Sequence, residues 1–243
     1  MIELPDHEAH LWYTEEDKIQ DPGLLSQYEE LLTEAEKLQW KRFYFAADQH
    51  RYLITRALIK TTLSQYINQP PQAWSFAENQ YGRPHLAEPE HAWLRFNLSH
   101  TKGMVVCLVS RQREVGVDVE NLERKSDGLL GIAEHFFAPK EVSALRALPM
   151  EQQRQRFFSY WTLKESYIKA RGMGLSLPLE KFAFVSLSPI VLELDPSLQD
   201  RAERWEFSLR SLGEQFLLAT ALERTAPELR ILEKKVVPLV LGG

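Results

Sequence analysis

The spacing of apolar positions along the chain predicts helices and strands in a definite order. Residues 33–45 and 49–65 carry apolar side chains with helical periodicity, and Thr33 with Glu36 three residues later is typical of a capping box that begins a helix. A short apolar segment precedes these helices, and three strand-like runs follow them. The apolar segment covers 10–13, and the runs cover 74–77, 93–98 and 104–110.

The second half of the chain repeats this order of elements. A strand predicted at 115–120 is followed by helical patterns and then by strand-like runs. The helical patterns cover 129–137, 139–147 and 152–171, and the strand-like runs cover 182–187, 205–209 and 215–222. Corresponding runs are offset by about 110 residues, which indicates an internal duplication. We predict an α+β fold, a pseudo-twofold pair of similar α+β subdomains at 1–112 and 113–243, with the active site in the cleft between them.

Composition and charge limit the classes of protein that fit this pattern. The 243 residues, 44% of them hydrophobic, are enough to bury a substantial core. The net charge of −5, with scattered Lys and Arg, disfavours nucleic acid as a partner. The single cysteine, Cys107, cannot form an internal disulfide, which fits a reducing compartment. Because no signal-peptide pattern and no membrane-spanning apolar stretch occur, we expect a cytoplasmic protein with no membrane partner. We also expect a monomer.

Two carboxylates in the strand 115–120 are candidates for chemistry. Alternation along a strand places Val117 and Val119 on one face and Asp118 and Glu120 on the other, about 6 to 7 Å apart. Such a pair is tolerated on a solvated strand face, and it also suits a hard cation such as Mg²⁺. The strand pattern alone leaves both interpretations open.

A helix predicted further along the chain carries a second set of charged residues. Trp161, Glu165 and Lys169 recur every four residues and therefore share one face of that helix. Gly172 and Gly174 come after the helix rather than between a strand and a helix, so they indicate a C-cap and not a dinucleotide fingerprint. No zinc spacing, Walker sequence or Gly-x-Ser-x-Gly elbow occurs in the sequence.

Three further residues are weaker candidates for binding an anion. His100 follows a strand-like run, Arg83 lies in a turn with a planar guanidinium suited to phosphate, and Arg51 lies on a helix. Each also fits an ordinary surface role: a capping histidine, a loop charge and a solvent-facing helix arginine.

Several short motifs together resemble one enzyme family. They are Gly82-Arg83-Pro84, Asn97-Leu98-Ser99-His100, Gly116-Val117-Asp118-Val119-Glu120, Phe136-Phe137 with Glu141, and Trp161-Thr162-Leu163-Lys164-Glu165-Ser166-Tyr167-Ile168-Lys169 with Gly172-Met173-Gly174-Leu175. Their order and spacing, from about 42 to 184, resemble the 4′-phosphopantetheinyl transferases of the Sfp type. The chain departs from the family pattern at Arg83, where Lys is common, and at Glu36 and Gln39 beside Lys37, where basic residues are common.

The resemblance implies a reaction and a metal. The phosphopantetheine arm of coenzyme A would be transferred to a serine of an apo acyl or peptidyl carrier protein of fatty acid, polyketide or nonribosomal peptide synthesis, releasing adenosine 3′,5′-bisphosphate. Mg²⁺, with Mn²⁺ as a substitute, would be held by Asp118, Glu120 and Glu165. Lys169 would stabilise charge on the leaving side, and Glu165, directly or through a water, would deprotonate the serine.

The resemblance also implies binding surfaces. Arg51, Arg83 and His100 would hold the 3′-phosphate and adenine end of coenzyme A, with Ser99 and Thr101 as supporting donors. The segment 121–133, with Lys125, Leu129 and Leu130 exposed, would contact the carrier protein. The same segment also fits an ordinary connecting loop and helix.

Two alternative functions use overlapping residues. A metal-dependent hydrolase of coenzyme A or a related pyrophosphate would use the same carboxylates with water as the nucleophile. A non-catalytic coenzyme A binding protein would keep Arg83 and His100 without needing a metal. Turnover of coenzyme A without any carrier protein distinguishes the hydrolase from the transferase.

Overall fold

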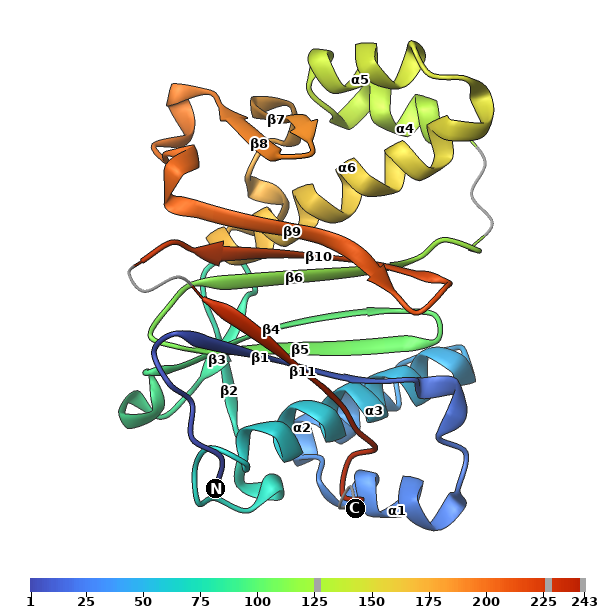
Figure 1. Cartoon of the computed structure of the whole chain (residues 1–243). Helices are drawn as coiled ribbons and strands as arrows, with labels where there is room; N and C mark the ends of the chain where they lie inside the picture. Colours follow the sequence, from blue (N-terminus) through green and yellow to red (C-terminus); the bar gives the residue numbers. More distant parts are fainter. Residues whose placement is uncertain (125–127, 226–228, 241–243) are drawn as a thin grey trace. The chain divides into compact units, whose positions relative to one another are not determined.

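The described chain divides into two compact α+β units. The computed structural model describes residues 1–124, 128–225 and 229–240 (Figure 1). The described part of the first unit comprises 1–78, 84–113 and 229–240, and that of the second comprises 79–83 and 114–225. This division differs from the predicted subdomains in two places, because the last strand belongs to the first unit and a short loop of the first half belongs to the second. The predicted α+β class is confirmed.

The first unit is built on a four-stranded sheet in the order β11-β1-β5-β4. These strands are β1 (Glu8–Thr14), β4 (Leu94–Thr101), β5 (Met104–Arg111) and β11 (Arg230–Lys235). Strand β1 pairs parallel with β11 and antiparallel with β5. Helices α1 (Pro22–Glu30), α2 (Glu34–Trp40) and α3 (Ala46–Leu63), and the hairpin strands β2 (Phe76–Glu78) and β3 (Pro84–Leu86), complete the unit. Helix α3 packs against β5.

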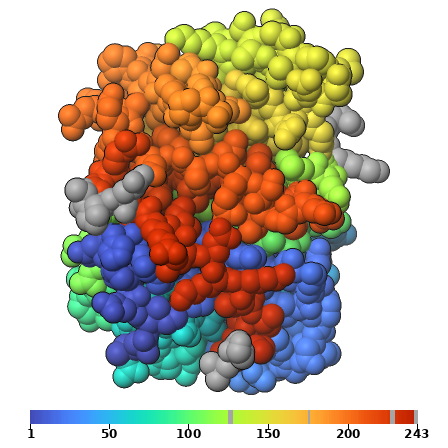
Figure 2. Space-filling model, in the orientation of Figure 1, coloured from blue at the N-terminus to red at the C-terminus, as the bar shows by residue number. Residues whose placement is uncertain are grey.

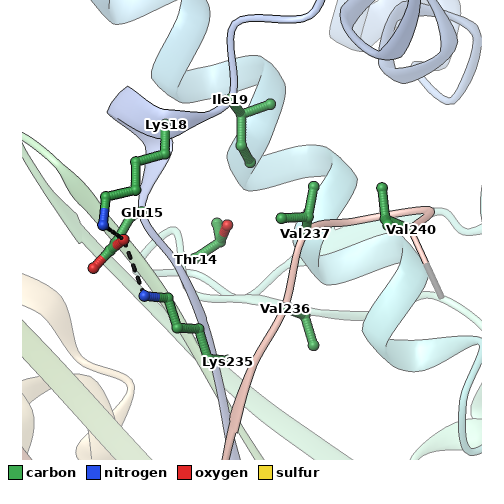
Figure 3. Close-up of a pocket in the computed structure, with 8 residues that line it drawn as sticks. All are labelled: Thr14, Glu15, Lys18, Ile19, Lys235, Val236, Val237 and Val240. Carbon is green, nitrogen blue, oxygen red and sulfur yellow. Dashed lines mark ion pairs between the residues drawn. The ribbon is translucent and has the colours of Figure 1, made fainter. Parts of the chain in front are cut away.

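Strand β11 forms one edge of this sheet, and every one of its residues is exposed or half-buried. Figure 2 shows this part of the chain in red on the surface. Beside it lies a cavity of about 280 Å³ in which Glu15 forms ion pairs with Lys18 and Lys235 (Figure 3). The cavity is lined by residues Thr14, Glu15, Lys18, Ile19, Lys235, Val236, Val237 and Val240, and no predicted site residue is among them.

The second unit is built on a three-stranded antiparallel sheet in the order β6-β10-β9. These strands are β6 (Val115–Asn121), β9 (Trp205–Leu212) and β10 (Phe216–Glu223). The remaining elements are α4 (Leu129–Phe136), α5 (Pro139–Arg146), α6 (Met150–Arg171), and the hairpin strands β7 (Phe182–Leu187) and β8 (Ile190–Leu194). Helix α6 packs along both β6 and β10 and covers one face of the sheet (Figure 1).

A buried lysine on the long helix of the first unit joins several elements. Lys60 of α3 lies 2.7 Å from Glu36 and donates hydrogen bonds to the carbonyl oxygens of Leu31, at 2.8 Å, and Trp74, at 3.3 Å. Glu36 also accepts from the backbone N–H of Thr33, and the predicted capping box is confirmed. Glu36, which stands where basic residues are common in the family, therefore pairs with a buried cation of its own unit.

The second unit contains the same arrangement on its own long helix. Lys164 of α6 lies 2.7 Å from Glu141 and donates to the carbonyl oxygens of Leu179, at 2.8 Å, and Phe182, at 2.6 Å. Glu141 lies in the first turn of the short helix α5 and accepts a hydrogen bond from the backbone N–H of Ala138. Glu36 lies in the first turn of α2 and accepts from the backbone N–H of Thr33 in the same way. The repeated lysine–glutamate pair is a structural sign of the duplication that the order of elements predicts.

Among the described residues, no helix is both long enough and apolar enough to span a membrane.

Candidate active site

Glycine at position 116 allows strand β6 to lie directly against helix α6. A Cβ atom at Gly116 would lie 2.0 Å from the carbonyl oxygen of Ser166 and 2.5 Å from the amide nitrogen of Ala170, so a larger residue would push the helix away. Further along the strand, Asp118 Oδ1 accepts a hydrogen bond from Lys169 Nζ at 2.6 Å. Close backbone packing therefore brings a carboxylate of β6 into contact with a cation of α6.

The two carboxylates of β6 are buried. Asp118 is 5% exposed and Glu120 is 7% exposed, and all seven residues of the strand are buried. The alternative of a solvated strand face is therefore wrong. The buried carboxylates are each paired with a cation. Lys169 contacts Asp118, and Arg124 Nη1 lies 3.0 Å from Glu120 Oε2.

The predicted face of helix α6 is present. From Phe157 to Ala170, the residues that remain partly exposed are Trp161, Glu165 and Lys169, and all the others are buried. Trp161 stacks on Phe157, with ring centroids 6.0 Å apart. The predicted sharing of one helix face by Trp161, Glu165 and Lys169 is thus confirmed.

Asp118 acts electrostatically on both glutamates. Burial and then the charge of Asp118 raise the pKa of Glu120 to about 7, while Arg124 and Lys169 act in the opposite direction. Burial and then Asp118 also raise the pKa of Glu165, which Lys169 lowers. When all three carboxylates are ionised they outnumber the two neighbouring cations, so the cluster carries excess negative charge.

The donor set fits Mg²⁺ by its chemistry, although its present arrangement is not that of a bound metal. In 1–124, 128–225 and 229–240, no three His, Cys, Asp or Glu side chains converge closely enough to hold a metal ion. Hard carboxylate oxygens with excess negative charge are the ligands that Mg²⁺ prefers. Lys169 and Arg124 contact Asp118 and Glu120, so these cations compete with any metal for the same oxygens.

The residues predicted to bind the far end of coenzyme A lie in the first unit, apart from Arg83. His100 belongs to β4 itself rather than to a turn after it, and its side chain is exposed. Ser99 and Thr101 are buried, so strand alternation places them on the face opposite His100. Arg51 is partly buried rather than solvent-facing, with Nε 2.9 Å from Glu16 and Nη1 3.0 Å from Asp48.

Arg83 belongs to the second unit and is extensively paired. Its Nη1 lies 2.6 Å from Glu114 Oε2 and donates to the carbonyl oxygen of Ala170 at 3.0 Å, while Nη2 donates to that of Val115 at 3.4 Å. The guanidinium therefore joins the beginning of β6 to the end of α6. Neither Glu114 nor Arg124 was among the predicted site residues. Glu120 lies on strand β6 and Arg124 in the turn after it, so no local spacing indicates their pairing.

The two leucines predicted to contact the carrier protein are only partly exposed. Leu129 and Leu130 on α4 are half-buried and pack against the core of the second unit, so the expectation that they are exposed is wrong. Lys125 lies outside the described residues. Phe136, near the end of the same helix, is 43% exposed and was not among the residues predicted to contact the carrier protein.

Comparison with known proteins identifies the family. Residues 114–221 match the model of the 4′-phosphopantetheinyl transferase superfamily, and 22–113 match the model of the 4′-phosphopantetheinyl transferase N-terminal region. The chain is 34% identical over 198 residues to the 4′-phosphopantetheinyl transferase HetI of a Nostoc species, covering 81% of this chain and 82% of that protein.

Two shorter matches agree with this result. Identity is 35% over 143 residues to the 4′-phosphopantetheinyl transferase Sfp of Bacillus subtilis, covering 59% of this chain and 61% of that protein. Identity is 37% over 141 residues to the 4′-phosphopantetheinyl transferase gsp of Aneurinibacillus migulanus, covering 58% and 56% respectively. The chain belongs to the 4′-phosphopantetheinyl transferase superfamily. As a member it is an enzyme that transfers 4′-phosphopantetheine from coenzyme A to carrier proteins.

Proposed function

We propose that the transfer takes place at the cluster formed by Asp118, Glu120, Glu165 and Lys169, with a serine of an apo carrier protein as the acceptor and adenosine 3′,5′-bisphosphate as the product. The observation that carries this proposal is the position of Asp118, which contacts Lys169 at 2.6 Å and raises the pKa of both glutamates. A cation held by these buried carboxylates, together with the ammonium of Lys169, would suit the concentrated negative charge of a pyrophosphate.

Asp118, Glu120 and Glu165 would hold Mg²⁺ in this proposal. The ion, when bound, supplies positive charge that neutralises the pyrophosphate and makes its phosphorus open to attack. The raised pKa of Glu120 and Glu165 supports the proposal, because like charges and burial leave these carboxylates in need of a cation. Mn²⁺, which accepts the same oxygen ligands, should substitute.

Lys169 and Glu165 divide the proton and charge chemistry between them. Lys169 is partly exposed beside Asp118, so its ammonium can stabilise negative charge that develops on the leaving phosphate. Glu165 lies one helical turn away on the same face and would accept the proton of the carrier serine, directly or through a water. Its raised pKa makes the carboxylate a stronger base than an exposed glutamate.

The first unit would bind the far end of coenzyme A through His100 and Arg51. Ser99 and Thr101 were predicted as supporting donors, but they are buried on the face of β4 opposite His100, so their side chains would not share its contact with the ligand. His100 is exposed on β4, whereas the charge of Arg51 is already balanced by Glu16 and Asp48. His100 is therefore the residue to test first. The segment 121–133, with Lys125, Leu129 and Leu130, remains our proposed contact with the carrier protein.

The reaction is tested by incubating the protein with coenzyme A, Mg²⁺ and a panel of apo carrier proteins. We expect the intact mass of at least one carrier to increase by one phosphopantetheine group, and a chelator to prevent the increase. In the absence of a carrier, coenzyme A should persist. Consumption of coenzyme A without a carrier would instead support the hydrolase, and binding without any turnover would support the non-catalytic alternative.

Removing the 3′-phosphate of coenzyme A should weaken binding through His100. Loss of one charge-assisted hydrogen bond costs about 1.5 to 3 kcal/mol, so the wild type should bind dephospho-coenzyme A roughly 10- to 100-fold more weakly than coenzyme A. His100→Ala should remove most of this preference in calorimetric titrations of both ligands. His85→Ala, which alters another exposed histidine of the same unit, is the matched control and should keep the preference. Equal preference in His100→Ala and wild type would return His100 to a surface role.

A further inference from the structure

The loop that carries Arg83 folds onto the C-terminus of helix α6. Asn79 Nδ2 donates to the carbonyl oxygen of Gly172 at 2.7 Å, while Asn79 Oδ1 accepts from the backbone N–H groups of Tyr81 and Arg83, each at 2.9 Å. One side chain thus shapes the loop and attaches it to the helix end. These contacts explain why 79–83 belongs to the second unit although its flanking strands belong to the first.

The helix end is shaped to accept the Arg83 side chain. Gly172 has φ +64°, a left-handed conformation in which other residues are strained. A Cβ atom at this position would lie 2.8 Å from Arg83 Cδ, so glycine also leaves room for the arginine stem. The stem crosses Gly172, and the guanidinium beyond it contacts Ala170 of α6 and both Glu114 and Val115 at the beginning of β6.

The environment of the guanidinium is poorly suited to an anionic ligand. The Arg83 side chain is 17% exposed, and Glu114 at 2.6 Å neutralises its charge. Two of its contacts are backbone carbonyl oxygens, which would lose a donor if the guanidinium turned towards a phosphate. Leaving buried acceptors without a donor is costly, so these contacts favour a fixed guanidinium.

We infer that Arg83 is a positioning residue for the catalytic cluster rather than a ligand of coenzyme A. This inference rests on the proposed roles of Asp118 and Lys169. Arg83 contacts Ala170, the residue after Lys169, and Val115, three residues before Asp118. By joining the two backbones at this point, Arg83 holds Lys169 and Asp118 in register. Lysine could not replace it fully, because one ammonium nitrogen cannot span three acceptors as the guanidinium fork does.

A positioning role and a phosphate-binding role of Arg83 predict changes in different kinetic constants. In Arg83→Met we expect kcat to fall on the order of tenfold to a hundredfold, as a small misplacement of catalytic groups produces. The KM for coenzyme A should stay within about twofold, and the preference for coenzyme A over dephospho-coenzyme A should be unchanged, because the 3′-phosphate site is intact. The concentration of Mg²⁺ needed for half-maximal rate should rise. Arg83→Lys should recover only part of kcat.

Other variants separate positioning from general stability. Glu114→Gln should reproduce part of the kcat loss, and the double variant Arg83→Met with Glu114→Gln should lose less than the sum, because the two residues share one contact. Arg111→Met, which removes an arginine paired with Asp6 in the first unit, is the control and should leave both kinetic constants unchanged. Rates are referred to folded protein measured by circular dichroism, and if Arg83→Met does not fold, Arg83→Lys and Glu114→Gln decide the question.

Two results would overturn the inference. If Arg83→Lys or Arg83→Met keeps kcat, raises the KM for coenzyme A and loses the preference over dephospho-coenzyme A, Arg83 binds the phosphate. If all Arg83 and Glu114 variants match the wild type, the contact has no role in positioning. A wild-type protein that transfers nothing to any carrier would instead contradict the proposed site, and this is seen before any variant is compared.

Discussion

Asp118→Ala should reduce transfer to carrier protein by on the order of a thousandfold while the protein stays folded. Asp118 contacts Lys169 and acts on both Glu120 and Glu165, so its removal takes away the carboxylate that the proposed cluster shares. The measurement is initial rate with saturating coenzyme A and carrier over a range of Mg²⁺ concentrations. Asp195→Ala, a matched change at the cap of a short helix of the same unit, should keep the wild-type rate.

The same variant should make the metal-free protein less sensitive to pH. A carboxylate with a raised folded-state pKa binds more protons in the folded than in the unfolded protein, so its contribution to stability falls as pH rises. For Glu120 this window runs from its ordinary value of 4.5 to about 7. Removing the charge of Asp118 lowers the pKa of Glu120 and should flatten the decline, measured by urea denaturation at pH 5, 6, 7 and 8. If Asp118→Ala transfers phosphopantetheine at nearly the wild-type rate, or does not fold, the proposed role of Asp118 in the cluster is contradicted.

Local patterns in the sequence predict the long helices well. The patterns at 49–65 and 152–171 correspond to α3, Ala46–Leu63, and α6, Met150–Arg171, because a helical pattern sustained over many residues is a strong signal. Helix α1 was missed although Asp21 caps it and Pro22 occupies its first turn, and these two residues were the available signal. The strand predicted at 74–77 corresponds to β2, Phe76–Glu78, but begins two residues too early, because the segment just before it follows the short 3-10 helix Pro71–Ala73.

Contacts between distant segments set the limit of such prediction. Strand β11 pairs parallel with β1, more than two hundred residues earlier in the chain, and no local periodicity indicates that partner. For the same reason the sequence does not reveal that Arg83 pairs with Glu114, 31 residues later. A turn arginine followed by proline indicates a solvated charge or an anion site, whereas its buried partners depend on the packing of β6 against α6.

The candidate site shows the same division between local and distant information. The spacing of Glu165 and Lys169 on one helix face follows from helix geometry and is confirmed. The burial of Asp118 and Glu120 does not follow from alternation, because alternation assigns polar residues to solvent unless a second element covers them. Helix α6 packs on β6 and supplies Lys169 as a partner, which makes a buried carboxylate tolerable.

Lys164→Met should destabilise the second unit by about 3 to 5 kcal/mol, because it leaves the buried carboxylate of Glu141 without its cation. Both side chains of this pair are fully buried, and Lys164 also serves two backbone carbonyl oxygens. Glu141 keeps two backbone N–H donors, those of Ala138 and Phe184, and burial already raises its pKa, so protonation limits the loss. The measurement is the unfolding transition in urea, followed by the fluorescence of the tryptophans.

Two further lysines of the chain make the prediction graded. Lys60→Met breaks the equivalent pair of the first unit, but Glu36 is partly exposed and keeps Arg56 at 3.5 Å, so the loss should be smaller than that of Lys164→Met. Lys140→Met removes an exposed ion pair with Glu193 and should change stability by less than about 0.5 kcal/mol. Combining Lys164→Met with Glu141→Gln should cost less than the sum of the single changes, since each single change leaves one unpaired buried charge and the double variant leaves none. Equal losses of unfolding free energy in the three lysine variants would show that burial of the ion pair does not determine the cost of breaking it. The repeated lysine–glutamate contact would then not be what holds each long helix to its unit.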